Sequence, residues 1–178
     1  GSVPGLSDLA LEADEVLCSH THGDHGCRAA VKIRPHAAEN PFTVETIRCP
    51  HDDAGGTKRG MNTIHILTAG GEKIVHMGDV GCALPEADMA KLRGALALLI
   101  PVGGYYTIDA READAMARAI GARVVIPMHY RTATSGFDVI APLEDFLALR
   151  DDITRCGDEV TLTGGERGTF VLTQRAMM

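Results

Sequence analysis

One short stretch near the start of the chain decides how the rest is interpreted: Ser19-His20-Thr21-His22-Gly23-Asp24-His25. It has the form H-x-H-x-D-H. At the end of an extended strand, residues two apart point the same way, so the imidazoles of His20 and His22 can converge on one ion. Gly23 permits a sharp turn, after which Asp24 and His25 can face a second ion. Imidazole with carboxylate suits zinc, and also manganese, iron or nickel.

Three more residues with metal-ligating side chains come directly after strand-like runs farther along the chain. They are His51, Asp79 and His129. Since each follows the end of a strand, we expect one rim of the sheets to gather them. Seven ligands are too many for one tetrahedral ion, and they suit two ions that share a bridging carboxylate. The full predicted ligand set is His20, His22, Asp24, His25, His51, Asp79 and His129.

Composition sets the broad class of the protein. The 178 residues are 45% hydrophobic and 23% charged, which excludes a disordered chain and predicts one globular domain over residues 1–178. No apolar run approaches the roughly 18 residues of a membrane span, and no signal peptide is expected. The net charge of −7 argues against nonspecific nucleic-acid binding. Five cysteines without a CxxC pair predict free thiols and a cytoplasmic protein.

Local patterns predict short strands early and helix–strand alternation later, which indicates an α+β arrangement of helices on β-sheet layers. Asp109, three residues before Glu112, predicts a capping box for a helix over 109–121. Further helices are expected from Pro142 to Arg150 and, more weakly, over 86–93. Residues 69–72 predict the turn of a hairpin. Strands are expected at 15–19, 31–34, 43–49, 62–69, 73–76, 97–101, 123–127, 159–163 and 168–173.

His20-Thr21-His22-Gly23-Asp24-His25 resembles the main signature of the metallo-β-lactamase-fold hydrolases. Five further stretches are similar to one branch, the ascorbate-6-phosphate-lactonase-like metal-dependent hydrolases: His51–Asp53, Arg59–Thr63, His76–Asp79, Ile100–Thr107 and Val125–Tyr130. The likeness runs from about Ala13 to Tyr130 and more loosely to the end. It implies an αβ/βα four-layer sandwich, with two facing sheets flanked by helices and the site at one edge.

The same resemblance assigns the ligands to two ions. It implies that His20, His22 and His51 hold the first ion, that Asp24, His25 and His129 hold the second, and that Asp79 bridges them. The family usually opens with a hairpin and a further strand, on the order of 25–45 residues, ahead of this motif. Here the motif begins at residue 20, and those first strands are not found ahead of it. If they are absent from the protein, one sheet edge would be open.

The expected function is a dinuclear metal-dependent hydrolase, with zinc first among the metals. A metal-bridging hydroxide would attack a small ester, lactone or phosphoester, and Asp24 could accept its proton. Two alternatives stay open: a di-iron oxygen or nitric-oxide reductase domain, whose branch usually has Glu in place of His22, and a non-catalytic metal-binding domain. The expected partner is a small-molecule substrate, and a homo-oligomer is left open.

Other polar residues have more than one interpretation. Tyr105, Tyr106 and Tyr130 are expected to be pocket walls, oxyanion donors or packing residues. Arg59, with Lys58, is expected to receive a substrate anion or to lie in a solvated turn. Cys18 and Ser19 are expected to be structural, and Asp109 a helix cap. Asp52 and Asp53 are interpreted as loop carboxylates, with hydrogen bonding to His51 or His22 as the alternative. His36, His65 and His76 are interpreted as packed or surface histidines, although His76 could support a metal ligand.

Overall fold

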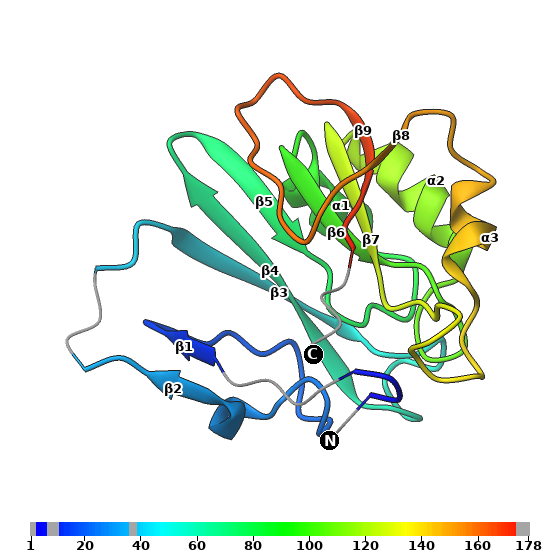
Figure 1. Ribbon diagram of the computed structural model, residues 1–178, viewed down its shortest axis with the longest axis horizontal. Coiled ribbons are helices and arrows are strands. Elements are labelled where there is room, and N and C mark those ends of the chain that lie inside the picture. Colours follow the sequence, from blue (N-terminus) through cyan, green and yellow to red (C-terminus); the bar gives the residue numbers. More distant parts are fainter. Residues whose placement is uncertain (1–2, 7–10, 36–38, 174–178) are drawn as a thin grey trace.

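The computed structural model describes residues 3–6, 11–35 and 39–173. Its main feature is a seven-stranded mixed sheet with the strand order β3-β4-β5-β6-β7-β9-β8. A separate pair of parallel strands, β1 (Leu11–Ala13) and β2 (Val31–Ile33), lies beside it. In Figure 1 this pair lies apart from the three labelled α-helices, which group on the other side of the view.

The large sheet begins with an antiparallel meander and continues with parallel strands. β3 (Thr43–Pro50), β4 (Met61–Ala69) and β5 (Glu72–His76) are antiparallel neighbours, and Ala69 pairs with Glu72 across the predicted hairpin turn. β5 then pairs in parallel with β6 (Ala97–Pro101), and β6 with β7 (Val124–Met128). Consequently β3, β5, β6 and β7 all run in one direction, and their carboxyl ends meet at one edge of the sheet.

The remaining strands and the helices complete the fold. β9 (Gly168–Val171) lies parallel to β7, and β8 (Ile153–Arg155) lies parallel to β9. The helices are α1 (Glu86–Leu92), α2 (Ala110–Ile120) and α3 (Leu143–Leu147), with a 3-10 turn η1 at Arg28–Ala30. The capping box of α2 is confirmed, because Asp109 accepts from the backbone of Glu112 and Glu112 in turn accepts from the backbone of Asp109.

Alternation along the strands gives the sheet two apolar faces. Leu98 and Ile100 of β6 face the main core, together with Met116 and Ile120 of α2 and with the apolar side chains of α1 and α3. Ala97 belongs to a second, smaller core on the opposite face, covered by side chains from the 156–162 segment. Both faces of the parallel strands are therefore buried, as expected when chain crossovers cover a parallel sheet.

Two predicted strands are absent, and two observed strands were not predicted. Residues 15–19 and 159–163 form no strand, whereas β1 and β8 do. The 15–19 segment joins the sheet through one backbone bond, from Thr63 N to Ser19 O at 2.8 Å. In the 159–163 segment, Val160 and Leu162 pack onto the second core without a strand partner. Apolar, β-rich residues indicate burial on a pleated surface, and they do not guarantee a hydrogen-bonded ladder.

Two predictions made from composition concern the cysteines and membrane-spanning segments. All five cysteines are free, as predicted. Within the described ranges, the helices are too short or too polar for any of them to traverse a lipid bilayer. The prediction for His36 lies outside the described residues.

Candidate metal centre

We expected the His20–His25 stretch to lie at the end of a strand. It lies instead in an irregular segment. A tight turn shapes it. The backbone N–H groups of His25 and Gly26 both donate to the carbonyl of His22, at 2.9 and 2.7 Å. This turn folds Asp24 and His25 back toward His20, whose ring stacks on that of His25 with 4.5 Å between centroids. The predicted convergence therefore arises from loop hydrogen bonds and not from the alternation of a strand.

His20 is buried and is oriented by its neighbour Ser19. The hydroxyl of Ser19 lies 3.0 Å from His20 Nδ1, and His20 Nε2 has no hydrogen-bond partner. Burial lowers the pKa of His20 to about 4, although Asp79 opposes the shift. The imidazole is therefore neutral at pH 7. If Nε2 is a metal ligand, Nδ1 must carry the proton and donate it to Ser19, which is the arrangement typical of ligating histidines.

Asp79 follows β5 in a turn that Asn62 of β4 holds from the side. Asn62 is fully buried; its amide donates to Met77 O at 2.8 Å, and its oxygen accepts from Asp79 N at 2.8 Å. Gly78 has a φ of +56°, and a β-carbon there would lie 2.2 Å from the Asn62 oxygen. Only glycine fits this turn, because both the backbone conformation and the space exclude a side chain. The turn is thus specified by residues on two strands.

His51 follows β3 and begins a loop that Asp52 organises. The Asp52 carboxylate is buried and accepts four backbone N–H bonds, from Ala54, Gly56, Lys58 and Arg59, at 2.7–2.9 Å. Burial by itself raises the pKa of Asp52, but these four donors outweigh it and lower the pKa to about 2. The structure therefore favours the loop interpretation of Asp52. Asp53 likewise forms an exposed ion pair with Lys58 at 2.7 Å.

His129 follows β7 in a backbone conformation that is unusual for its type. Its φ is +54°, in the left-handed region that non-glycine residues rarely adopt. Such strained residues concentrate at functional sites. Burial lowers the pKa of His129, but the adjacent Asp79 carboxylate outweighs burial and raises it above its ordinary value. Asp79 is correspondingly shifted: burial raises its pKa, while the imidazoles around it, His129 first, lower the pKa to about 2.

The seven predicted ligands lie together at this edge of the sheet. Asp79 Oδ2 is 3.4 Å from the Nε2 atoms of both His25 and His129, 3.5 Å from that of His51, and 3.9 Å from that of His20. Asp24 Oδ2 is 3.5 Å from His25 Nε2. The ligand atoms form two groups, and within each group all atoms lie within 4.8 Å of one another. One group is His20, His22 and His51; the other is His20, His25 and Asp79.

This geometry fits bound cations. The distances between Asp79 and the imidazoles are longer than ordinary hydrogen bonds, and they leave room for an ion between the ligand atoms. Among the described residues, three buried imidazole nitrogens have no hydrogen-bond partner. They are His20 Nε2, His51 Nδ1 and His129 Nδ1. Buried imidazoles around one carboxylate, with ring nitrogens left without hydrogen-bond partners, are the pattern expected when a metal completes the site.

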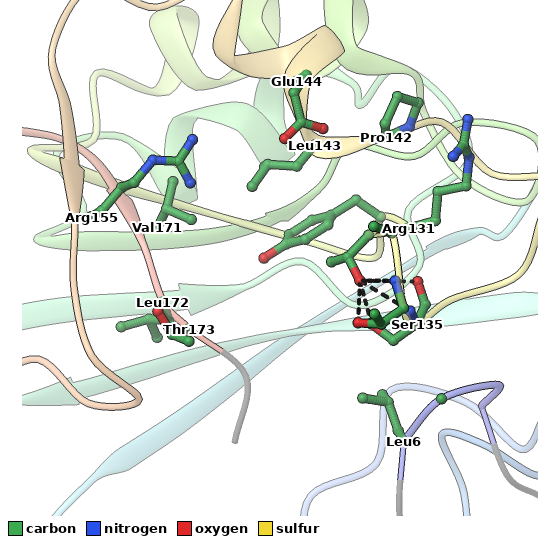
Figure 2. A pocket seen from close by; sticks show the side chains of 15 residues that line it. Leu6, Arg131, Ser135, Pro142, Leu143, Glu144, Arg155, Val171, Leu172 and Thr173 are labelled. Carbon is green, nitrogen blue, oxygen red and sulfur yellow. Dashed lines mark hydrogen bonds between the residues drawn. The ribbon is translucent and has the colours of Figure 1, made fainter. Parts of the chain in front are cut away.

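The predicted substrate contacts lie in two different places. The guanidinium of Arg59 lies 5.7 Å from the centre of the Tyr105 ring and 5.3 Å from the centre of the Tyr106 ring. Tyr130 instead packs against the main core and lines a separate cavity of about 610 Å³. Figure 2 shows that cavity with Leu143 and Glu144 above it, Arg155 at the left and Leu6 below. None of the described residues that line it is a predicted metal ligand.

His65 and His76 are packed residues beneath the site, as interpreted from the sequence. They pair across β4 and β5 and line a cavity of about 310 Å³ that also contacts Asp24 and His25. Burial lowers the pKa of both imidazoles. His76 Nδ1 also accepts from the backbone N–H of Gly78 at 3.1 Å, so it supports the turn that carries Asp79.

The sequence analysis did not identify the residues that orient the proposed metal-ligating side chains. Ser19 was interpreted as structural, Tyr106 as a pocket wall, an oxyanion donor or a packing residue, and Asn62 was assigned no role. One signal for Asn62 was available: it is polar, yet it stands in a strand whose neighbours at 64 and 66 are apolar and face the core. A buried amide in such a position needs backbone partners, and here those partners flank Asp79.

Comparison with known proteins identifies the family. Residues 4–129 match the family described as "Beta-lactamase superfamily domain". A curated protein from Thermoplasma acidophilum, named a UPF0173 metal-dependent hydrolase, is 32% identical over 171 residues, covering 78% of this chain and 74% of that protein. This chain belongs to the beta-lactamase superfamily domain family and, within it, to the UPF0173 metal-dependent hydrolases. A second family member, from Hyperthermus butylicus, is 36% identical over 122 residues, but this chain spans only 49% of its length.

Solved structures agree with this family. A crystal structure from Thermotoga maritima, described as a candidate Zn-dependent hydrolase of the metallo-beta-lactamase superfamily, has a TM-score of 0.72 and 30% identity. The match covers 91% of this chain and 82% of that one. A metal-dependent hydrolase from Parabacteroides distasonis, at 15% identity and a TM-score of 0.57, shares the fold alone. The metallo-β-lactamase fold predicted from the His20–His25 motif is therefore confirmed.

Proposed function

We propose that this family member, as one domain over residues 1–178, is a dinuclear metal-dependent hydrolase that acts on a small ester, lactone or phosphoester. The observation that carries the proposal is the position of Asp79 Oδ2, 3.4–3.9 Å from four imidazole Nε2 atoms. The metal-dependent hydrolase names of the relatives support the reaction class. The resemblance to ascorbate-6-phosphate-lactonase-like hydrolases supports a lactone or phosphoester.

The proposed ligand sets divide the site in two. His20, His22 and His51 would hold one ion, Asp24, His25 and His129 would hold the other, and Asp79 would serve both. When bound, two divalent cations, zinc first, would supply Lewis acidity and a hydroxide nucleophile at neutral pH.

The protein's own part in the reaction is to hold neutral imidazoles and to accept a proton. Burial keeps the pKa of His20 at about 4, so its imidazole is neutral at pH 7, and a proton on Nδ1 donated to Ser19 would leave Nε2 available as a ligand. Asp24, whose side chain is 27% exposed, can accept a proton from the nucleophile and pass it to solvent. Ser19 and Asn62 fix the directions of His20 and Asp79.

The test combines metal content with hydrolysis. We expect two zinc ions per chain by elemental analysis, and hydrolysis of aryl esters, lactones or phosphodiesters that stops on addition of a chelator and returns with zinc. His22→Ala removes one proposed ligand and should abolish turnover, whereas Thr21→Ala, an exposed change in the same loop, should not. Turnover that survives the chelator, or a single ion per chain at full activity, would contradict the dinuclear mechanism.

A further inference from the structure

Arg59 lies on an aromatic wall formed by Tyr105 and Tyr106. Its guanidinium carbon is 5.3 Å from the centre of the Tyr106 ring and 5.7 Å from that of Tyr105. The two rings pack edge to face with 4.7 Å between centroids. Both distances to Arg59 lie within the range of about 6 Å for cation–π attraction. The rings therefore hold the guanidinium in one place, which limits the entropy it would lose on binding a ligand.

This wall adjoins the candidate metal centre on two sides. The Tyr106 ring lies 6.3 Å from the His129 ring, nearly perpendicular to it. Arg59 belongs to the loop that begins at His51, and its backbone N–H donates to Asp52 at 2.7 Å. Asp52 is buried beside His51, so the loop cannot shift without disturbing that histidine. The guanidinium thus extends from the loop that carries His51 and lies on a ring that packs near His129.

The backbone that carries the wall is strained. Tyr105 has a φ of +58°, and the adjacent turn is closed by a bond from Tyr106 N to Gly104 O at 2.7 Å. The Tyr105 side chain is 62% exposed, a large apolar surface left in contact with water. A left-handed tyrosine and an exposed ring both cost free energy, and strain of this kind concentrates where a side chain must be presented to a ligand.

The charge of Arg59 is not matched by a carboxylate. Its neighbour Lys58 forms an ion pair with Asp53 at 2.7 Å. Arg59 has no such pair among residues 3–6, 11–35 and 39–173, where its side-chain contacts are the two rings. A half-buried guanidinium keeps planar N–H donors that match the oxygens of a carboxylate or a phosphate.

We propose that Arg59, held on Tyr105 and Tyr106, binds an anionic group of the substrate, so that the substrate carries a carboxylate or phosphate away from the bond that is hydrolysed. This inference rests on the proposed function and narrows its substrate class. Arg59 is then a specificity-determining residue: it selects anionic over neutral substrates and takes no part in breaking the bond.

The kinetic test compares three 4-nitrophenyl esters on the zinc-loaded protein: butyrate, which is neutral, succinate, which ends in a carboxylate, and 3-phosphonopropionate, which ends in a phosphonate. Arg59→Met should lower kcat/KM for the anionic esters by about 10- to 100-fold, the effect of losing a charged hydrogen-bond pair. The butyrate value should change by less than about 3-fold. The two anionic esters distinguish a carboxylate from a phosphate site. Lys58→Met, which removes the same charge from the same loop, should leave the preference intact.

A binding test works without metal and without turnover. The chain has three tyrosines and no tryptophan, so its intrinsic fluorescence reports largely on Tyr105 and Tyr106. Adding inorganic phosphate or succinate to the metal-free protein should change this fluorescence in a saturable way, and Arg59→Met should abolish the change while Lys58→Met keeps it. Equal loss for neutral and anionic esters, or fluorescence titrations that Arg59→Met leaves unaltered, would overturn the inference. Absence of ester hydrolysis together with a normal titration would instead contradict the proposed function alone.

Discussion

Asn62 shows how one buried side chain positions another at the candidate metal centre. It is fully buried, and its two amide ends bond to backbone atoms on either side of Gly78. The ring of His20 is fixed in a comparable way by Ser19. The ligand atoms are thus aimed by neighbours that would not themselves touch an ion, as is usual for metal sites.

At the residue scale we predict that Asn62→Asp weakens metal binding. The new carboxylate still accepts from Asp79 N, but it cannot donate to Met77 O, so the two oxygens repel and the turn at Gly78 shifts. We expect zinc affinity to fall by about 10- to 100-fold, the usual effect of losing a partner of a ligand. Competition with a zinc-binding dye measures it. Thr63→Val on the same strand is the control, and equal affinities in both variants would contradict the prediction.

The loop from His51 to Gly60 behaves as one element because Asp52 accepts four of its backbone N–H groups. None of these residues belongs to a strand or a helix. The Asp52 carboxylate supports them instead, by satisfying donors that would otherwise be left without partners. By bonding to the backbone of Arg59, the Asp52 carboxylate also fixes the point from which the Arg59 side chain extends toward the tyrosine rings.

At the element scale we predict that Asp52→Asn loosens this loop. An amide has a single accepting oxygen, so at least two of the four backbone donors lose their partner. Hydrogen exchange at Ala54, Gly56, Lys58 and Arg59 should quicken by about 10-fold or more, because each lost bond to a charged acceptor lowers the cost of opening. Asp53→Asn removes an exposed carboxylate from the same loop and should leave exchange at these four amides unchanged; an effect of similar size there would refute the role of Asp52.

At the scale of the whole molecule, three buried histidines and one half-buried histidine make stability depend on pH. Burial lowers the pKa of His20 to about 4, and it also lowers the pKa of His51, His65 and His76. In the unfolded chain these groups titrate near 6.5. Below that pH the unfolded state therefore binds protons that the folded state does not, and stability is lost as pH falls from about 6.5 toward 4. His129, whose pKa is raised, acts in the opposite direction but is a single group.

We therefore predict that the metal-free protein melts at a lower temperature at pH 5 than at pH 7.5. Thermal unfolding with a chelator present measures this. His65→Gln, which removes one buried imidazole outside the proposed ligand set, should reduce the difference between the two pH values. A melting temperature that is equal or higher at pH 5 would show that the raised pKa of His129 dominates. With zinc present the difference should grow, because protons and metal compete for the same nitrogens.

How much of the fold could be predicted differs from element to element. The helix over 110–120 was predictable because its capping box and its stop at Gly121 are local signals. The β4–β5 hairpin was predictable for the same reason, since its turn residues are adjacent. The 15–19 segment was wrongly predicted as a strand, because a ladder needs a partner over several residues and only Ser19 finds one.

The sequence by itself determined which side chains are available for chemistry: the histidines and aspartates of the His20–His25 motif, and His51, Asp79 and His129, each after a strand-like run. The strand ends predicted that one rim gathers them, but only the tertiary structure decided which atoms meet there, and that Ser19, Asn62 and Tyr106 stand beside them. The physical reason is topological. Four strands far apart in the chain run in the same direction, so their carboxyl ends converge on one edge of the sheet, and no local pattern records which strands become neighbours.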